Sequence, residues 1–271
     1  MPPWTAPWTT LLVISASLGF VSLEDREHVC LTKKAETVVV GNQSMLFVKS
    51  LEVTCHVIAN DTLENVCDTR DSNDAYPHSI NVKNCSESSI ESILGDNFNS
   101  ILSLNLSHSG LVTVQPHMLE YKYKLLLLDL SFNSIVNIPA AAFSDLTRLK
   151  YLLLQHNRLR ALDLSRINPI QSRLTHLDLS HNLMTMIDVG AGVFSHLQTL
   201  NLSCNNISSF NLNSDLRLNF DNLRMLDVSH NHISGTLFKA DIDVFHKNIP
   251  FTVDLSYNNI SRIDLRDTLE P

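Results

Sequence analysis

The chain has 271 residues, and 44% of them are hydrophobic, which is enough for a substantial buried core. Its formal net charge is −8, and it contains no run rich in lysine and arginine. This charge argues against general binding to nucleic-acid phosphates, so we expect no nucleic-acid partner.

The first 22 residues have the pattern of a signal peptide. Residues 11–22 (LLVISASLGFVS) form an apolar run with the length of a signal-peptide core, too short to span a bilayer. Ser17 and Gly19 favour cleavage after Gly19, and cleavage after Ser22 is the alternative. The same run also fits a buried N-terminal strand or helix. We predict a signal peptide over residues 1–22 and a secreted protein without a membrane span.

Four cysteines lie in residues 23–98, which are predicted to form an N-terminal cap. In an exported chain, Cys30, Cys55, Cys67 and Cys85 indicate two disulfides. Three pairings are open, and we favour Cys30 with Cys55 and Cys67 with Cys85. A zinc site is the alternative, but the sequence has no C-x-x-C pair to anchor one.

The same region contains a predicted β-hairpin. Residues 37–40 and 45–55 are rich in β-formers and are separated by a Gly-Asn pair. Residues 99–271 contain a repeated pattern that is described below. Such a hairpin would cover the open edge of the first repeat unit. A degenerate repeat unit through Ile80 and Val82 would join this cap to the units that follow.

Seven N-x-Ser/Thr triplets are predicted glycosylation sites: Asn42, Asn60, Asn84, Asn105, Asn201, Asn206 and Asn259. Only the first three support secretion independently, because the repeat itself produces the other four.

Residues 99–271 contain about seven copies of the pattern L-x-x-L-x-L-x-x-N-x-L, in which other aliphatics replace some leucines. The Asn position recurs every 23 to 27 residues, at Ser109, Asn133, Asn157, Asn182, Asn205, Asn231 and Asn258. The aliphatics predict short strands that stack in parallel around a shared core. Each Asn side chain is expected to bond backbone groups in the turn after its strand. No cap is evident after the last unit, which would need its own tail, a partner or further sequence to cover it.

This pattern is the leucine-rich-repeat signature, and the chain resembles extracellular members of that superfamily of the Toll-receptor and adhesion-protein type. The resemblance implies an α/β solenoid with a parallel sheet on its concave face and with loops, 3₁₀ turns and short helices on its convex face. The N-terminal cysteines depart from the tight cap spacing of vertebrate proteoglycan-like members, which favours an invertebrate protein.

A second set of apolar residues is expected to fill the convex side of the core. One residue follows each turn, at Val114, Ile138, Leu162, Ile187, Phe210 and Ile263. Phenylalanines precede the next strand, at Phe143, Phe194, Phe220 and Phe245.

Three columns of side chains are expected on the concave face, each from one position of the repeat. The first is Ser103, Leu127, Tyr151, His176, Thr199, Met225 and Thr252. The second is Asn105, Asp129, Leu153, Asp178, Asn201, Asp227 and Asp254. The third is His108, Phe132, His156, His181, Cys204, His230 and Tyr257.

Each column has a functional and a structural interpretation. The aspartates of the second could form a ligand-facing stripe, but Asp is common in the repeat consensus, and we favour that explanation. The histidines of the third could bind a metal or respond to pH. The S-H-N triplet is also consensus-like, and His156 and His181 have no evident third ligand, so we expect no metal. Cys204 is expected to be a free thiol, with pairing to another chain as the alternative.

Apolar and aromatic side chains on an otherwise polar surface mark a contact site. The predicted ligand-binding residues are Leu127, Phe132, Tyr151, Leu153, His156, His176 and Asp178. Glycans at Asn105 and Asn201 would flank these units. The sequence has no H-E-x-x-H, G-x-S-x-G or phosphate-binding glycine loop, so we expect neither catalysis nor a cofactor.

The superfamily resemblance implies recognition of a protein, a glycan or a microbial surface molecule, in innate immunity or in adhesion. The first hypothesis is a soluble recognition protein that binds through its concave face. The alternatives are an adhesion or matrix protein that self-associates, with homo- or hetero-oligomers forming through the open C-terminal repeat, and a non-catalytic subunit of a secreted enzyme.

Overall fold

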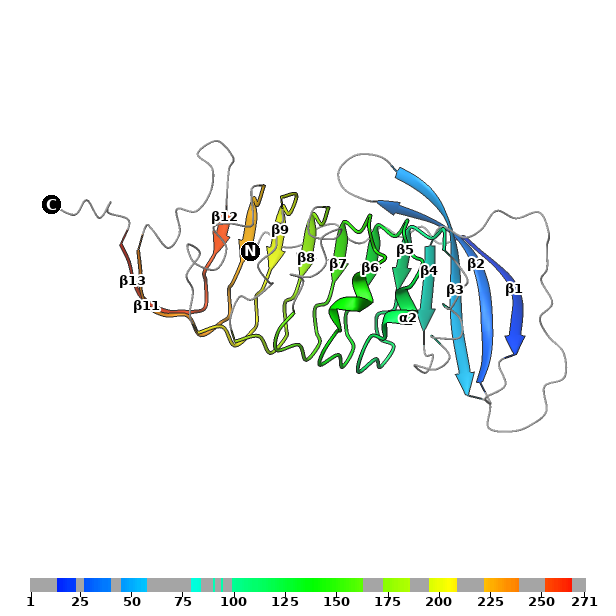
Figure 1. Cartoon of the computed structure of the whole chain (residues 1–271), viewed down its shortest axis with the longest axis horizontal. Coiled ribbons are helices and arrows are strands. Elements are labelled where there is room, and N and C mark those ends of the chain that lie inside the picture. The colour runs from blue at the N-terminus through cyan, green and yellow to red at the C-terminus, as the bar shows by residue number, and fades with distance from the viewer. Residues whose placement is uncertain are drawn as a thin grey trace.

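The computed structural model describes residues 79–83, 90, 94, 99–162, 173–185, 195–208, 222–238 and 252–264, with the backbone of three further strands over 14–22, 27–39 and 45–57. Within these residues, eleven strands form one sheet whose strands stand in a row (Figure 1). In spatial order they are β1 (Ile14–Ser22), β2 (Glu27–Val39), β3 (Met45–Val57), β4 (Ser79–Lys83), β5 (Ser103–Asn105), β6 (Leu127–Asp129), β7 (Tyr151–Leu153), β8 (His176–Asp178), β9 (Thr199–Asn201), β10 (Met225–Asp227) and β12 (Thr252–Asp254). Strands β11 (Ser234–Phe238) and β13 (Asn259–Asp264) pair in a second, parallel sheet.

The repeat strands pair in parallel at equivalent positions, as the solenoid prediction requires. Leu128 of β6 faces Leu104 of β5 on one side and Leu152 of β7 on the other. The same register continues through β8, β9, β10 and β12. Strand β4 pairs in parallel with β5, which confirms the degenerate unit at Ile80 and Val82. The predicted leucine-rich-repeat solenoid is therefore correct.

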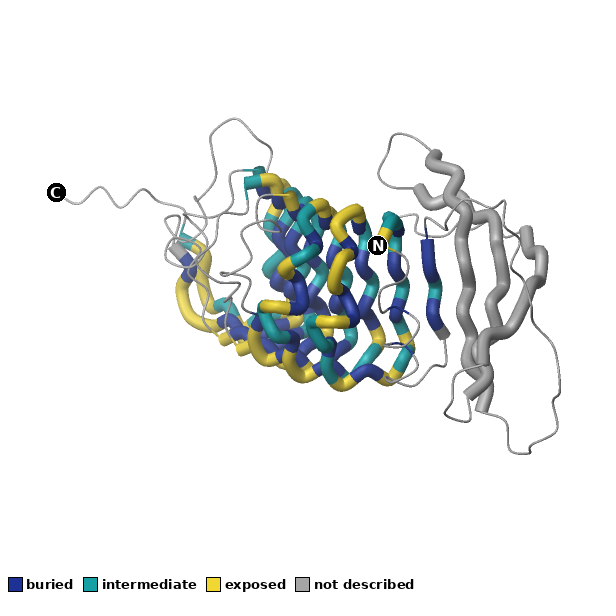
Figure 2. Tube along the Cα trace, turned by 45° about the vertical axis from the view of Figure 1, so that its right-hand side comes forward, coloured by how far each residue is buried: buried dark blue, intermediate teal, exposed yellow. Residues whose placement is uncertain are grey.

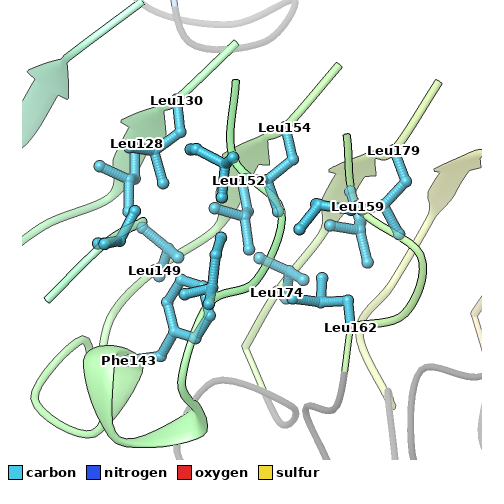
Figure 3. Packing of buried hydrophobic residues seen from close by; sticks show 14 of the residues in the cluster. Leu128, Leu130, Phe143, Leu149, Leu152, Leu154, Leu159, Leu162, Leu174 and Leu179 are labelled. Atoms are coloured by element: carbon cyan, nitrogen blue, oxygen red, sulfur yellow. The ribbon is translucent and has the colours of Figure 1, made fainter. Parts of the chain in front are cut away.

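The core lies behind this sheet and consists of the regularly spaced aliphatics. The middle residue of each strand from β5 to β10 is buried while the first residue remains partly exposed. Leu152 and Leu154 of one unit pack beside Leu128 and Leu130 of the preceding unit (Figure 3). Buried residues accordingly run along the array, with exposed residues on its outer turns (Figure 2). Each unit contributes only part of this interior, so units stabilise one another through their neighbours.

The convex side contains only short helical segments among the described residues. They include the four-residue helix α2 (Pro116–Leu119) and the 3₁₀ helix η1 (Ala140–Phe143), and Ile90 and Leu94 are also helical. As predicted, this side of the core is filled by buried apolar residues, namely Val114, Ile138, Phe143 and Leu162. Of the other predicted convex residues, Ile187, Phe194, Phe210, Phe220 and Phe245 lie outside the described residues.

The prediction that Ile263 also fills the core is wrong. Its side chain is 50% exposed, and it lies in β13 rather than behind the main sheet. The earlier units are covered by the unit that follows each of them. Within the described residues no later unit packs on β13, so the equivalent aliphatic remains open to solvent.

One buried charge was not foreseen from the sequence. The Lys122 side chain is fully buried, and its ammonium group donates to the carbonyl oxygens of Leu94 at 2.9 Å and Glu120 at 3.1 Å. It also donates to Oδ1 of Asn99 at 3.4 Å. These bonds compensate for removing the charge from water, and they join the first units of the array across 23 to 28 residues of sequence.

The predicted hairpin is present and is longer than expected. Strands β2 and β3 pair antiparallel, and β3 pairs in parallel with β4, so the hairpin covers the edge of the first repeat. Strand β1, which pairs antiparallel with β2, comes from the run predicted to be a signal peptide. In the full chain this run therefore follows the alternative interpretation as a strand, while export and cleavage stay predictions.

The asparagine side chains connect successive turns through an internal ladder of hydrogen bonds. Asn157 is 7% exposed, and its amide donates to the carbonyl oxygens of Leu130 in the preceding unit and Leu154 in its own, at 2.9 and 3.0 Å. Its Oδ1 accepts from the Ile135 N–H of the preceding unit at 3.0 Å. The same arrangement recurs at Asn133, Asn182, Asn205, Asn231 and Asn258. Each asparagine thus satisfies backbone groups that the short strands leave unpaired.

Replacing Asn157 with leucine should destabilise the array more than the change in volume implies. The Ile135 N–H would remain buried without a hydrogen-bond partner, which costs about 1–3 kcal/mol. The Leu130 carbonyl would lose one of its two amide donors and keep the one from Asn133. We expect Asn157→Leu to lower the urea midpoint clearly. Asn137→Leu, the same substitution at an exposed asparagine, should leave the midpoint nearly unchanged. Equal urea midpoints for both variants would contradict the stabilising role of the asparagine hydrogen bonds.

Candidate ligand-binding face

Strand register brings the three predicted columns onto one continuous face. The inner column is the first residue of each strand from β5 to β12: Ser103, Leu127, Tyr151, His176, Thr199, Met225 and Thr252. The acidic column is the last residue of each strand: Asn105, Asp129, Leu153, Asp178, Asn201, Asp227 and Asp254. The turn column follows three residues later: His108, Phe132, His156, His181, Cys204, His230 and Tyr257.

The turn column is held in a backbone conformation that L-residues rarely adopt. All seven residues have positive φ angles, between 53° and 56°. Since the backbone repeats, their side chains leave the turns in the same direction. This left-handed position costs free energy for residues other than glycine and asparagine, and the bonded turns around it must maintain it.

As a result, the rings of the turn column stack into a ladder. The ring centroid of Phe132 lies 4.4 Å from that of His108 and 4.2 Å from that of His156. His156 and His181 follow at 4.0 Å, and all three pairs are within 16° of parallel. The sequence predicted the column, but it did not reveal this stacking, which depends on the shared φ angle. His108 and His181, absent from the predicted contact residues, belong to the same ladder.

A second stack lies on the inner column. The Tyr151 and His176 rings are 4.6 Å apart, and the imidazole Nδ1 of His176 is 2.9 Å from the Thr175 hydroxyl. Burial raises the pKa of Tyr151 and lowers the pKa of His176. The imidazole of His176 is therefore favoured in its neutral form.

The acidic column has a structural role in the turns. Oδ1 of Asp178 accepts from the N–H of Ser180 at 2.9 Å, which closes the turn after β8. The equivalent bond is present after Asn105, Asp129, Asn201, Asp227 and Asp254. This supports the interpretation that the aspartates belong to the repeat. The second carboxylate oxygen of Asp178 is 3.4 Å from the Asn201 amide of the next unit.

The unit of β7 departs from this rule. Leu153 stands where the other units have Asp or Asn, so the N–H of Gln155 loses the acceptor that closes the other turns. In addition, Oε1 of Gln155 is buried without a hydrogen-bond partner among the described residues. The fold therefore gains nothing evident from Leu153 and Gln155, although the same unit carries Tyr151 and His156.

The seven predicted contact residues lie on β6, β7 and β8 and in the turns that follow β6 and β7. Leu127, Tyr151 and His176 share one register position, and Leu153 and Asp178 share another. Phe132 and His156 lie in the ladder beside them, and the Phe132 ring is 43% exposed. The structure thus places all seven residues on one face. Their role in ligand binding stays a prediction.

Comparison with known proteins agrees with this architecture. The sequence profile of the family described as "Leucine rich repeat" matches residues 99–159 and 172–233. Tsukushi of Mus musculus is 33% identical over 147 residues, which cover 54% of this chain and 40% of that protein. Toll-like receptor 10 of Bos taurus is 35% identical over 127 residues, which cover 38% of this chain and 16% of that protein. A chain in the crystal structure of the LRIM1/APL1C complex matches with a TM-score of 0.56 and 22% identity, over 80% of this chain and 38% of that one.

Residues 99–159 and 172–233 are leucine-rich repeats. The relatives of the chain include a Toll-like receptor, as the repeat pattern implied. The chain spans less than half the length of the relatives it matches, so the activities of those whole proteins are not transferred to it. An invertebrate source stays a prediction.

The predicted glycosylation sites of this leucine-rich-repeat chain fall in three groups. Asn105 and Asn201 end β5 and β9, the strands that flank β6 to β8. Asn206 is exposed in the turn after β9, and Asn259 is exposed at the start of β13. Asn42, Asn60 and Asn84 lie outside the described residues. Whether any of these asparagines carries a glycan stays a prediction.

The cysteines of the cap are only partly within the described structure. Cys30 in β2 pairs with Thr54, and Cys55 in β3 pairs with Val29, so these two cysteines are not directly opposite each other. Cys67 and Cys85 lie outside the described residues, and the disulfide pairing stays a prediction. Cys204 is free among the described cysteines, and burial raises the pKa of its thiol.

No group of three or more His, Cys, Asp or Glu side chains among the described residues could hold a metal ion. No helix in this part of the chain is long and apolar enough to cross a membrane.

The turn role of the acidic column can be tested at Asp178. Asparagine fills the same position in β5 and β9 and makes the same turn bond, so Asp178→Asn should change the unfolding free energy by less than about 0.5 kcal/mol. Asp178→Leu removes the acceptor of the Ser180 N–H and should cost about 1–3 kcal/mol. Denaturant unfolding measures both, and equal effects would contradict this role.

Stability should fall on mild acidification. Burial lowers the pKa of His156 and His176 in the folded state, and repulsion from His181 lowers that of His156 further. Below the ordinary histidine pKa of about 6.5, the unfolded chain therefore binds more protons than the folded chain. The urea midpoint should decrease from about pH 7.5 to about pH 6. His176→Thr, which introduces the residue that Thr199 supplies at the same position of the next strand, should reduce this slope. An unchanged slope would contradict the assignment.

Proposed function

We propose that this is a secreted leucine-rich-repeat binding protein that recognises a protein or microbial surface ligand through the concave face of β6, β7 and β8. The signal-like N-terminus and the three glycosylation triplets outside the repeats support secretion. The Toll-receptor resemblance supports a role in innate immunity. We expect binding rather than catalysis.

The β7 unit carries the argument for the binding face. Six of the seven units close their turn with an Asp or Asn side chain, and β7 replaces it with Leu153. This replacement removes a turn bond, and in the same unit the Oε1 atom of Gln155 is buried without a hydrogen-bond partner among the described residues. Departures from a repeating structural rule that bring no structural gain are expected at functional positions.

The surroundings of Leu153 support the same conclusion. Its neighbours in adjacent columns include the stacked Tyr151–His176 and Phe132–His156 rings. Rings already fixed by stacking lose little conformational entropy when a partner binds, so they are suitable contact residues.

Self-association is the second candidate, because the C-terminal units expose large apolar side chains. Tyr257 is 75% exposed and Ile263 is 50% exposed. Within the described residues, β12 and β13 each have one sheet partner only. Light scattering of the purified protein, with and without reductant, distinguishes the candidates, since a strict monomer argues against self-association.

Binding to cells tests the proposed face. Protein harvested from the medium of a secretory cell line, labelled with a fluorophore, would be titrated onto animal cells and fixed bacteria. Tyr151→Ala should weaken the binding at least tenfold, because it removes the centre of the ring surface. Tyr123→Ala is the matched control, since this tyrosine is 47% exposed and belongs to none of the three columns.

The two variants must first give the same circular dichroism spectrum as the wild type. If Tyr151→Ala binds cells as well as the wild type does, the proposed binding face is wrong. Equal loss of binding in both tyrosine variants would also contradict it.

A further inference from the structure

The charges on the three columns of the concave face favour partners of one charge over partners of the other. We propose that the face of β6, β7 and β8 docks a protein segment carrying lysine or arginine side chains, and that acidification releases this segment. The inference rests on the proposed function, because it names the partner chemistry of the same face.

The three columns contain carboxylates and no permanently cationic residue. On β6, β7 and β8 they include Asp129 and Asp178, and Asp227 and Asp254 follow on β10 and β12. From β5 to β12 the columns contain no lysine or arginine. Lys150, which is exposed, immediately precedes β7 and belongs to none of the three columns. A partner with exposed phosphate, sulfate or carboxylate groups would meet repulsion here, whereas a cationic segment would be attracted.

The carboxylates are held in place before any partner arrives. One oxygen of Asp178 accepts the turn N–H of Ser180, and the other is 3.4 Å from the Asn201 amide. Burial raises the pKa of Asp178, and this carboxylate forms no ion pair among the described residues. An ammonium or guanidinium group would supply the missing countercharge at these fixed oxygens.

The ring surfaces suit the rest of such a side chain. Lysine and arginine have long apolar stems that pack on aromatic groups while the charged end reaches a polar partner. Phe132 is 43% exposed, and Tyr151 and Leu153 are half-buried beside the carboxylates. Apolar contacts and carboxylates therefore alternate across the face, as a basic segment requires.

The histidine ladder gives the face its response to pH. His156 stacks between Phe132 at 4.2 Å and His181 at 4.0 Å, with Asp178 and His108 as the other charged or titratable groups that act on it. On the inner column, His176 stacks on Tyr151. Protonation of these imidazoles would place positive charge beside Asp178 and oppose a cationic partner. Protonation of the buried carboxyls would remove negative charge, so both changes weaken binding as the pH falls.

Two synthetic peptides provide the probe. One alternates lysine with serine, and the other has glutamate in place of each lysine. Their binding to the full chain would be measured by interferometry at about pH 7.4 and about pH 5.5, because lysine stays charged over this range while histidine does not. We expect the lysine peptide to bind at the higher pH, at least fivefold more weakly at the lower pH, and the glutamate peptide not to bind.

A matched pair of variants separates this face from the general negative charge of the chain. Asp178→Asn and Glu120→Gln each remove one charge, but Glu120 is exposed after α2 and lies outside the columns. Asp178→Asn should weaken binding of the lysine peptide about threefold to tenfold, while Glu120→Gln should change it by less than about twofold. Equal effects would assign the attraction to net charge and overturn the proposal. No binding of the lysine peptide would also overturn it.

A third variant tests the release. His156→Asn combined with His181→Asn removes two titratable groups from the ladder, and asparagine tolerates the positive φ at both positions. This variant should lose most of the difference in affinity between the two pH values. A pH response equal to that of the wild type would overturn the release mechanism, and Asp178→Asn would still test the docking.

The outcomes also separate this inference from the proposed function. If Tyr151→Ala abolishes binding to cells but Asp178→Asn does not affect it and the lysine peptide fails to bind, the face is functional and the partner chemistry is wrong. If Tyr151→Ala leaves binding to cells intact, the proposed function fails, whatever the peptides do.

Discussion

The hydrogen bonds of the asparagine ladder are the constraint on which the rest of the structure depends. A strand of three residues offers few backbone bonds of its own, and the turn after it leaves buried N–H and carbonyl groups to be satisfied. One asparagine per unit bonds groups in its own unit and in the preceding unit, as at Asn157. Each coil therefore fixes the position of its neighbour, and the aliphatic residues merge into one interior.

The binding face follows from this constraint. Because every coil repeats the same turn, the residue before each asparagine has the same positive φ, and the side chains at that position are aligned. Alignment at the strand spacing places rings such as Phe132 and His156 in contact. The asparagine hydrogen bonds inside the solenoid thus align the side chains on its surface. At these aligned positions a single residue such as Leu153 can change the surface chemistry without changing the fold.

The sequence predicted the periodic parts of the molecule well. The spacing of leucine and asparagine was sufficient for the parallel strands, the buried core and the column positions, because these depend only on equivalent places in the repeat. It could not predict the ring stacking of His156 with His181, which depends on φ angles. It was wrong for Ile263, because the pattern assumes a following coil that the described structure does not place there. The partner of a face depends on chemistry outside the repeat, which periodicity does not encode.

Hydrogen–deuterium exchange tests the central claim most directly. The N–H groups of Ile135, Leu159, Met184, Ile207 and Ile233 each donate to the asparagine of the following unit. If the ladder joins the coils, these five amides should exchange slowly and at similar rates, close to those of the buried strand amides. Exchange as fast as that of exposed turn amides would show that the asparagines do not hold the coils together.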